Sequence, residues 1–533
     1  MAFSLSPELV ISSLVIILVL WYYLYMEHRR PKNRLHRPVD WPILGMVPSL
    51  VGNRHNLHDY VTGVLAASGH NFTAHGPATT GMRFFVTCDP ANVRHIFTSN
   101  HANYPKGQEF AEIFDVMAGS FFTVDGEPCR RQRAKIQSVL GSPRMVASMA
   151  SCCLGKVRDG LLPFLTRMAA AGTPFEMQDL ITRFVFDVTA MPVFGVDPGR
   201  LSPDMPPMHV AAAMDTVMEV ALFRHTVPAS FWKAMRRFNL GPERKLAVAH
   251  TVLHSFIAEM MEKARKATQH HGGDNDAGEQ QEAAASSNLR ILSSYVNDPE
   301  YNANDDLLRA TLINYMIAGR DTIGTTLPWF FYNLAMNPHV VAGIRQELAP
   351  IVASRKAATT SASNGDDTDT TVTTFEPEDT KPLVYLQAAL YESLRLYPPG
   401  PVERKTVVAG DVMPSGDEVR AGDTVFISLY SMGRMEGLWG KDCLEYRPER
   451  WLSDDGGRKK LRYVPSNKFL AFNSGPRMCL GKDIAVMQMK TVAAAVMWNF
   501  DVEVVQGQAV EPKLSCILQM KNGLMVKVKK RGM

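Results

Sequence analysis

One cysteine near the C-terminal end of the chain is surrounded by residues that suit a metal-binding thiolate. Cys479 lies in the segment FNSGPRMCLGKD, residues 472–483, together with two glycines and two basic residues. A thiolate ligand must stay deprotonated and hydrogen-bonded at sulfur, and glycines at 475 and 481 allow a tight turn whose amides point at it. Arg477 lies two residues away and can pair with a carboxylate of a bound cofactor. The alternative is a buried structural cysteine in a glycine-rich turn.

A thiolate is the ligand that pushes electron density onto a haem iron and favours O–O cleavage. The segment therefore predicts a haem site with Cys479 as the axial ligand of the iron. The chain has no CxxC pair, which argues against structural zinc, and its odd total of seven cysteines argues against a secreted disulfide scaffold. We expect the remaining cysteines to be small buried side chains: Cys88, Cys129, Cys152, Cys153, Cys443 and Cys516.

Asp321 and Thr322 are polar residues in the middle of a long apolar stretch, residues 305–336. This stretch predicts a helix that crosses the core, because it is too long and too apolar for a surface helix. Buried polar side chains need partners or a chemical role. Thr322 can bond back to the carbonyl of Ala318, which is the purely structural alternative. Pro328 removes a backbone hydrogen bond and predicts a kink.

Glu392 and Arg395 stand three residues apart in the segment ESLR. This spacing places both side chains on one helix face, where they can form a buried and hydrogen-bonded pair. The alternative is a surface ion pair worth about 0.3–0.5 kcal/mol. Taken without their context, the two residues favour the surface pair.

Together these segments resemble the cytochrome P-450 family. Phe472, Gly475, Arg477, Cys479 and Gly481 match its haem-thiolate signature FxxGxRxCxG, which is long and specific. Three further segments precede the signature in the family's order and are similar to its oxygen-activation motif, its ExxR motif and its PERF motif: AGRDT (318–322), ESLR (392–395) and RPERW (447–451). The resemblance covers nearly the whole chain.

The resemblance implies a mainly α fold with small β-sheets, the cytochrome P-450 fold, built as a single haem domain. It also implies haem b as the cofactor and monooxygenase activity with O₂. The chain has no nucleotide-binding fingerprint of its own, so electrons are expected from NADPH through a separate reductase. The reductase is expected to dock on the basic surface around the cysteine, near Lys468, Arg477 and Lys482.

The resemblance also assigns roles to single residues. Arg450 completes a network with Glu392 and Arg395 that holds the cysteine loop in position. The hydroxyl of Thr322 steers protons to the bound dioxygen, while Asp321 feeds a water relay. Gly319, in the same motif, leaves room for oxygen above the iron.

One position departs from the family's pattern. The family usually has a Trp and, four residues later, a basic residue, and both serve the haem propionates. In this chain Cys129 stands at the Trp position and Arg133 is retained. Arg130 and Arg131 are the candidates to substitute for the missing donor, and weaker haem retention is the expected consequence.

The N-terminal segment predicts a membrane anchor, residues 1–30. Residues 9–26 carry no charge, and at about 1.5 Å per residue they span roughly the hydrocarbon layer of a bilayer. Aromatic residues crowd the end of this run and five basic residues follow within 29–37, which places the bulk of the chain on the cytosolic side. The segment has neither a positive start nor a small-residue cleavage site, which argues against a cleaved signal peptide. We expect a single-pass protein of the endoplasmic reticulum membrane.

The rest of the chain reads as one domain. A basic, proline-rich linker, residues 31–50, leads into a haem-thiolate monooxygenase domain, residues 51–533. Two low-complexity inserts, residues 269–288 and 354–379, lack the apolar residues that offset ordering entropy and are predicted to be mobile surface loops. The net charge of +4 gives nucleic-acid binding no electrostatic support.

Within the family the chain most resembles the plant fatty-acid ω-hydroxylases and midchain alkane hydroxylases. It does so in DWPILGMVPSL, NYPKGQEF, AGRDTIGTTLPWFF and FNSGPRMCLGKD. We therefore expect hydroxylation of a long-chain lipid, at the ω-position of a fatty acid or in the middle of an alkane. The wall positions that the resemblance indicates are strongly apolar, which suits an aliphatic chain: residues 110–124, helix faces near 205–245, 313–318, 401–402 and 517–518.

Other activities remain open on the same residues. A minority of this plant group acts on aromatic, specialised metabolites, so the fold alone does not settle the substrate. A haem-dependent isomerase or dehydratase needs no acid–alcohol pair, and the presence of Thr322 argues against it. A membrane-anchored haem-binding protein without catalysis is compatible with Cys129, but the otherwise complete set of motifs argues against it.

Overall fold

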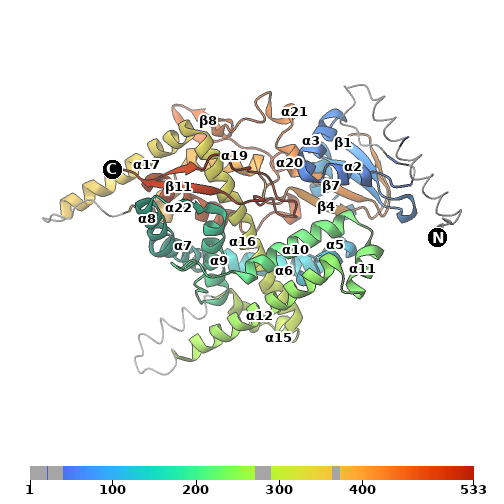
Figure 1. The fold of residues 1–533 in the computed structure, drawn as a ribbon, viewed down its shortest axis with the longest axis horizontal. Coiled ribbons are helices and arrows are strands. Elements are labelled where there is room, and N and C mark those ends of the chain that lie inside the picture. Colours follow the sequence, from blue (N-terminus) through green and yellow to red (C-terminus); the bar gives the residue numbers. More distant parts are fainter. Residues whose placement is uncertain (1–20, 22–39, 42, 271–289, 363–371, 533) are drawn as a thin grey trace, which may run out of the picture.

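The computed structural model of the protein describes residues 21, 40–41, 43–270, 290–362 and 372–532. Long helices make up most of this part, and small sheets lie among them (Figure 1). The mainly helical architecture with small sheets is the predicted one. The predicted anchor, residues 1–30, lies outside the described residues apart from Trp21. Within the described ranges, no helix combines the length and the apolar character needed to span a bilayer.

The helices follow the chain from one end to the other. Their bounds are α2 (Val47–Gly52), α3 (Leu57–Ala67), α4 (Pro90–Arg94), α5 (Gln108–Ile113), α6 (Gly126–Leu140), α7 (Pro143–Lys156), α8 (Leu162–Ala171), α9 (Met177–Phe194), α10 (His209–Thr226), α11 (Ala229–Arg237), α12 (Gly241–His270), α14 (Ile291–Val296), α15 (Pro299–Asn302), α16 (Asp305–Met336), α17 (Pro338–Ala362), α18 (Pro377–Thr380), α19 (Val384–Leu396), α20 (Leu429–Met432), α21 (Glu436–Trp439) and α22 (Lys482–Asn499).

The strands form two main sheets and two hairpins. One sheet has the order β1-β2-β7-β4, with β2 and β7 parallel and the other neighbours antiparallel. The second has the antiparallel order β10-β11-β3, and the hairpins are β5-β6 and β8-β9. The strand bounds are β1 (Asn71–His75), β2 (Arg83–Thr87), β3 (Phe175–Glu176), β4 (Val402–Thr406), β5 (Asp411–Val412), β6 (Glu418–Val419), β7 (Thr424–Ser428), β8 (Leu452–Asp455), β9 (Arg458–Leu461), β10 (Phe500–Val504) and β11 (Met525–Lys530).

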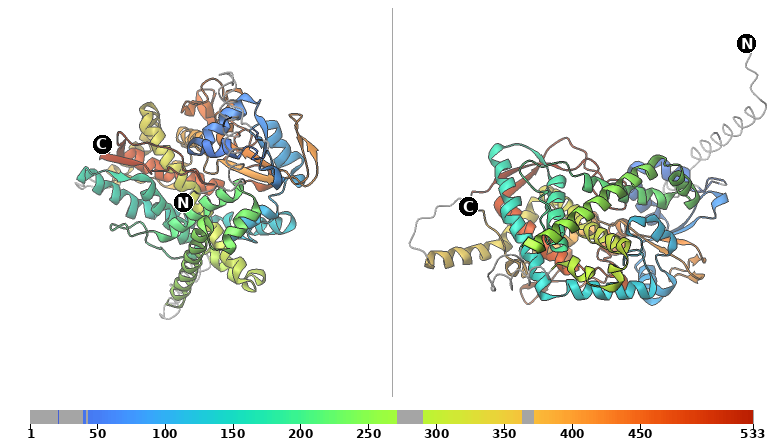
Figure 2. Two further views of the ribbon diagram at one scale, coloured as in Figure 1. Left: turned by 45° about the vertical axis from the view of Figure 1, so that its right-hand side comes forward. Right: turned by 90° about the horizontal axis from the view of Figure 1, so that it is seen from below.

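Helix α16 crosses the middle of the molecule, as Figures 1 and 2 show. It begins after Asn304, whose side chain accepts a hydrogen bond from the amide of Leu307, and two aspartates occupy its first turn. Such residues satisfy free amides and complement the helix dipole. The helix has the predicted bounds and continues unbroken through Pro328. Most of its residues are buried on every side, which is the pattern of a central helix.

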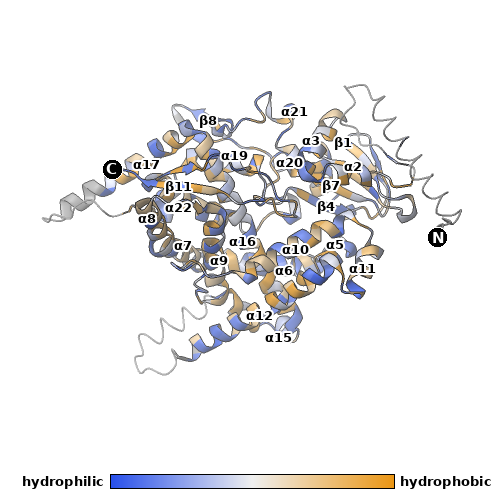
Figure 3. Cartoon of the chain, in the orientation of Figure 1, coloured by the Kyte–Doolittle hydropathy of each residue, from blue (hydrophilic) through white to orange (hydrophobic). Residues whose placement is uncertain are grey.

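Three clusters of buried apolar side chains make up the core. The first joins α8, α9, α16, α19 and α22 with β10 and β11. The second lies under α10 and α12, and the third covers the sheet that contains β2 and β7. In Figure 3 the projecting end of α12 is hydrophilic, consistent with its distance from these clusters. The site lies where the three clusters meet.

The second predicted insert has different limits in the structure. Helix α17 extends to Ala362, well past residue 354, and the short helix α18 lies at the end of the insert. The first half of α17 is anchored by buried Val340, Ile344 and Leu348, and helix propagation is cheap once nucleation is complete. For the first insert, α12 reaches His270, and residues 271–289 lie outside the described residues.

Candidate active site

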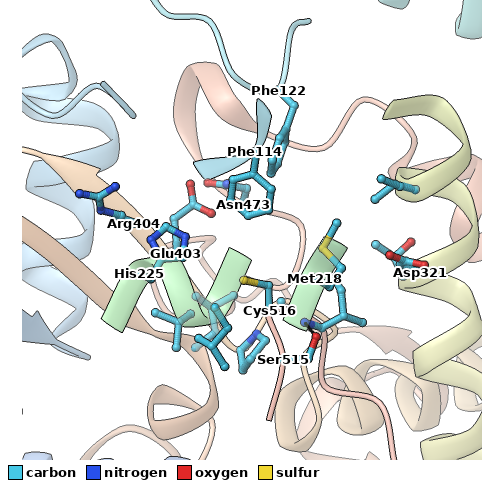
Figure 4. Close-up of a pocket in the computed structure, with 18 of the residues that line it drawn as sticks. Phe114, Phe122, Met218, His225, Asp321, Glu403, Arg404, Asn473, Ser515 and Cys516 are labelled. Atoms are coloured by element: carbon cyan, nitrogen blue, oxygen red, sulfur yellow. Dashed lines mark hydrogen bonds between the residues drawn. The ribbon is translucent and has the colours of Figure 1, made fainter. Parts of the chain in front are cut away.

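A cavity of about 960 Å³ lies in the centre of the molecule and brings together residues from distant parts of the chain. Its walls include most of the stretches that were expected to line it: the 110–122 loop, α10, α16, residues 401–402 and Ile517. Ile313 and Leu518 do not line it; both are fully buried in the core. In Figure 4, Asp321 on α16 and the Glu403–Arg404 pair lie on opposite sides, with Met218 of α10 between them.

Cys479 lies on the cavity wall and is exposed there. Its amide donates to the carbonyl of Phe472 at 2.8 Å, which closes the loop that carries the cysteine. Burial raises the pKa of the thiol, and a hydrogen bond from the Gly481 amide opposes that effect. A positive partner at the sulfur, such as a metal ion, would favour the thiolate over the thiol.

The two glycines of the loop serve different purposes. Gly475 has a φ of +58°, and a Cβ there would lie 2.1 Å from the carbonyl oxygen of Phe97, so the turn requires glycine. Gly481 precedes α22 with a φ of −95°, and a Cβ there would meet no protein atom. Its contribution to the site is the amide that reaches the sulfur.

Glu392 is fully buried and is the centre of a polar network. Its carboxylate accepts hydrogen bonds from Arg395 at 2.7 and 2.8 Å, from Arg450 at 2.7 Å and from the Trp451 indole at 2.8 Å. Arg395 also donates to the carbonyls of Cys443 and Glu445. The pair is therefore a buried network rather than the exposed surface pair of the alternative interpretation. Such networks hold their members in one arrangement when every partner is satisfied.

A chain of aromatic contacts connects this network to the cysteine loop. The ring of Trp451 lies 4.6 Å from Phe469, and Tyr391 lies 5.4 Å from Phe469 and 6.1 Å from Phe472. Phe472 in turn accepts the hydrogen bond from Cys479. The position of the thiol is thus coupled to the position of the Glu392 carboxylate.

Asp321 and Thr322 lie side by side on α16, where it borders the cavity. Thr322 is exposed to the cavity, and its hydroxyl donates to the carbonyl of Ala318 at 2.8 Å, which is the predicted structural bond. Asp321 accepts from Arg320 at 2.6 Å, and Arg320 also donates to Asp215 of α10 at 2.7 Å. Burial raises the pKa of Asp321 to about 6, although Arg320 opposes the shift. A carboxyl group with this pKa can both take up and release a proton near neutrality.

Gly319 has a packing role that differs from the expected one. A Cβ at this position would lie 2.5 Å from the Thr189 side chain on α9, not in open cavity. The missing side chain therefore lets α9 and α16 approach each other. Gly319 also lines the cavity, and the expected space for oxygen above the iron stays a prediction.

Helix α6 turns only one of its arginines toward the cavity. Arg133 lines the cavity and donates to the carbonyl of Met478, next to Cys479. Arg130 pairs with Glu127 and Arg131 with Glu300, and both arginines are exposed. Helical periodicity explains this, because positions one and two residues beyond Cys129 rotate away from its face. Neither arginine substitutes for the donor missing at position 129.

Arg477 is already engaged within the chain. It pairs with Asp125 at 2.5 Å and donates to the carbonyls of Phe121 and Val124. These contacts connect the cysteine loop to residues 121–125, part of the segment that borders the cavity. Arg477 also lines the cavity itself, so its remaining face is available to a bound group.

Several polar residues of the cavity were not predicted. Lys106, His225, Glu403 and Arg404 line it, and burial lowers the pKa of His225 well below its usual value, so this histidine is neutral. The alternation of β4 places Glu403 and Lys405 on one face, but of these two only Glu403 lines the cavity, so this pattern is a weak signal. The positions of the others follow from tertiary packing.

The comparisons with known proteins agree with this geometry. The sequence model of the family described as Cytochrome P450 matches residues 35–528. The chain is 37% identical to noroxomaritidine synthase 2 of Narcissus aff. pseudonarcissus MK-2014 over 93% of this chain and 91% of the relative. It is 36% identical to cytochrome P450 86B1 of Arabidopsis thaliana, covering 97% and 90%, and 35% identical to alkane hydroxylase MAH1 of Arabidopsis thaliana, covering 96% and 97%.

The chain therefore belongs to the cytochrome P450 family and is a monooxygenase of that family. The family implies a haem iron, and the donor set of the cavity fits it: the Cys479 thiol can hold the iron, and the guanidinium groups of Arg133 and Arg477 can hold the carboxylates. When bound, the haem supplies the activation of dioxygen. The predicted resemblance to this plant group is confirmed by relatives that include an alkane hydroxylase and cytochrome P450 86B1, and noroxomaritidine synthase 2 is equally similar.

Proposed function

We propose that the protein is a membrane-anchored haem-thiolate monooxygenase that hydroxylates a long-chain aliphatic lipid, with the ω-position of a fatty acid or a mid-chain position of an alkane as its target. The observation that supports this most is the cavity next to Cys479 and Thr322, whose walls are mainly aliphatic and aromatic. An apolar chain is held in such a space by burial, at about 0.8 kcal/mol per CH₂ group.

The residues of the chain divide the work between them. Met218, Ile317 and Ile517 contact the substrate from three sides of the cavity and exclude water. Thr322 presents a hydroxyl at the cavity surface, where it can position a water molecule. Asp321 lies directly behind it and can take up and release a proton, and Arg320 keeps that carboxyl in place. Proton delivery of this kind typically contributes about 10²- to 10⁴-fold to the rate.

Two parts of the proposal rest on the sequence. The uncharged run at residues 9–26, followed by basic residues, supports a single anchor in the endoplasmic reticulum membrane with the catalytic domain in the cytosol. The lack of a nucleotide-binding fingerprint supports a separate NADPH-dependent reductase as the electron donor. Lys468 and Lys482, near the cysteine loop, are the candidates for its docking surface.

Product analysis tests the proposal. Microsomes that contain the protein and a reductase are supplied with NADPH and with free fatty acids and n-alkanes of increasing length. Hydroxylated lipid is expected, with affinity rising with chain length. Omitting the reductase should abolish the product; turnover with NADPH alone would contradict the separate electron donor. If no lipid of the panel is hydroxylated, the proposed substrate class is wrong.

A specific feature of the cavity favours a second candidate, an aromatic specialised metabolite. Phe110, Phe114 and Phe122 line one wall with ring centroids 4.7–5.3 Å apart. Such a wall can stack on an aromatic substrate. Aromatic amines and phenols added to the same panel separate the two candidates, because only one class should give an oxidised product.

A further inference from the structure

Lys106 is a buried lysine whose charge has no acidic partner. The residue is 4% exposed, lies just before α5 and lines the cavity. Its ammonium nitrogen lies 3.7 Å from the ring centroid of Phe122 and 4.4 Å from that of Phe110. No carboxylate of the described residues lies within ion-pair distance of this nitrogen. Burial lowers the pKa of its ammonium group to about 7, because the charged form loses its contact with water; the charge of Glu403 opposes this shift.

The other cations around this end of the cavity have acidic partners, with one exception. Arg477 pairs with Asp125 at 2.5 Å, Lys405 with Glu403 at 3.3 Å and Arg404 with Glu109 at 2.5 Å. The exception is Arg133, which donates to a backbone carbonyl. Arg54 also lines the cavity but is exposed to solvent beside α3. Apart from the exposed Arg54, two cations of the described wall therefore lack a counter-charge, the half-buried Arg133 and the buried Lys106.

Two unpaired cations match the two propionate carboxylates of haem. We propose that Lys106 binds one propionate while Arg133 binds the other, so that Lys106 replaces the donor missing at position 129; Arg477, whose charge Asp125 already offsets, adds a hydrogen bond from its remaining face. Cys129 itself is only a weak donor, and its sulfur is directed at the carbonyl of Phe121 at 3.9 Å. A carboxylate beside Lys106 would compensate the cost of burying its charge.

The backbone around Lys106 supports this assignment. The amides of Lys106 and Gly107 donate to the carboxylate of Asp125 at 3.0 and 2.8 Å. The same carboxylate pairs with Arg477, two residues before the cysteine. Asp125 thus ties the backbone of Lys106 to the loop that carries Cys479, which places the lysine beside the residues that would hold a haem.

The main competing occupant is the carboxylate of a fatty-acid substrate. Once haem is bound, the charges of the buried wall balance, because two propionates offset Lys106 and Arg133. A substrate carboxylate would then add an uncompensated charge, which is unfavourable in a buried site. The inference rests on haem binding and not on the substrate class of the proposed function, so the two can fail separately.

The test compares haem retention in holoprotein variants. Lys106→Met keeps the length and ring contacts of the side chain and removes its charge; Lys106→Arg keeps the charge. Transfer of haem to apomyoglobin should be about 10- to 100-fold faster in Lys106→Met, the range expected for a lost charge-assisted hydrogen bond. Lys106→Arg should remain within about threefold of the wild type.

Lys135 provides a matched control. It also lies over aromatic rings, 4.7 Å from Tyr295 and 4.9 Å from Tyr301, but it pairs with Asp298 and does not line the cavity. Lys135→Met should therefore leave the transfer rate unchanged. Far-UV circular dichroism checks that each variant is folded, and if Lys106→Met does not fold, Lys106→Gln is measured in its place.

Three results would overturn the proposal. The first is a haem transfer rate in Lys106→Met, or in its replacement, equal to that of the wild type, which would make Lys106 a packing residue. The second comes from spectral titration with palmitate and with n-hexadecane: a selective loss of palmitate binding with unchanged haem retention would assign Lys106 to the substrate. Equal loss of haem in the Met and Arg variants would also contradict it.

Discussion

Replacing Glu392 by glutamine should destabilise the protein severely. The carboxylate accepts two hydrogen bonds from Arg395 and one each from Arg450, the Trp451 indole and the Arg447 amide. Glutamine has nearly the same volume, but its NH₂ group would face donors, and the buried Arg395 would lose its counter-charge. Removing one partner of a buried ion pair costs about 3–5 kcal/mol. A domain is stable by only about 5–15 kcal/mol.

The assay for Glu392→Gln is urea unfolding, followed by tryptophan fluorescence, together with the haem content of the purified protein. Because aromatic contacts connect Trp451 to the cysteine loop, haem content should fall along with the unfolding midpoint. Glu262→Gln is the control, since Glu262 forms a pair of the same three-residue spacing with Arg265 that is exposed. Equal midpoints for Glu392→Gln and the wild type would refute the reasoning from burial.

Three further predictions follow from the site. Cys479→Ser should abolish the red-shifted Soret band of the reduced carbon monoxide complex, whereas Cys129→Ser and Cys443→Ser should retain it; an unchanged spectrum in Cys479→Ser would exclude this axial ligand. Thr322→Val should keep its haem but release more hydrogen peroxide per NADPH, and full coupling would contradict the role of the hydroxyl. Asp321 has a pKa raised from 3.8 to about 6, so its protonation should stabilise the fold below about pH 4, and this contribution should disappear as the pH rises through 6. Urea unfolding midpoints of the wild type and of Asp321→Asn between about pH 4 and pH 6 measure this contribution to stability. Parallel pH profiles of the two proteins would contradict the raised pKa of Asp321.

Much of the fold could be predicted where local pattern determines structure. Helix α16 has the predicted bounds because its residues are apolar on every face. The end of α17 could not be predicted, because its last turns depend on an anchor earlier in the helix. Packing of α9 against Gly319 likewise involves residues far apart in sequence.

The motif residues of the site could be predicted, but most of their partners could not. The ExxR spacing predicts that Glu392 and Arg395 meet, since one helix carries both. The pairing of Arg320 with Asp215, and the place of Lys106 in the cavity, depend on how α10 and the 106–125 loop fold over α16. Charges in loops have no periodicity that reveals their direction. The outward direction of Arg130 and Arg131, in contrast, was available from helical geometry.

The composition of the cavity wall has a consequence for the timing of biosynthesis. The wall includes residues from Met46 near the start of the domain to Ile517 near its end, and the thiol is at position 479. At about 5–20 residues per second, a ribosome needs on the order of a minute to produce the second edge of the site after the first. A nascent chain therefore holds an incomplete pocket during nearly all of its synthesis. A haem that requires the full wall can bind only near the end of synthesis, so its uptake follows most of translation in time.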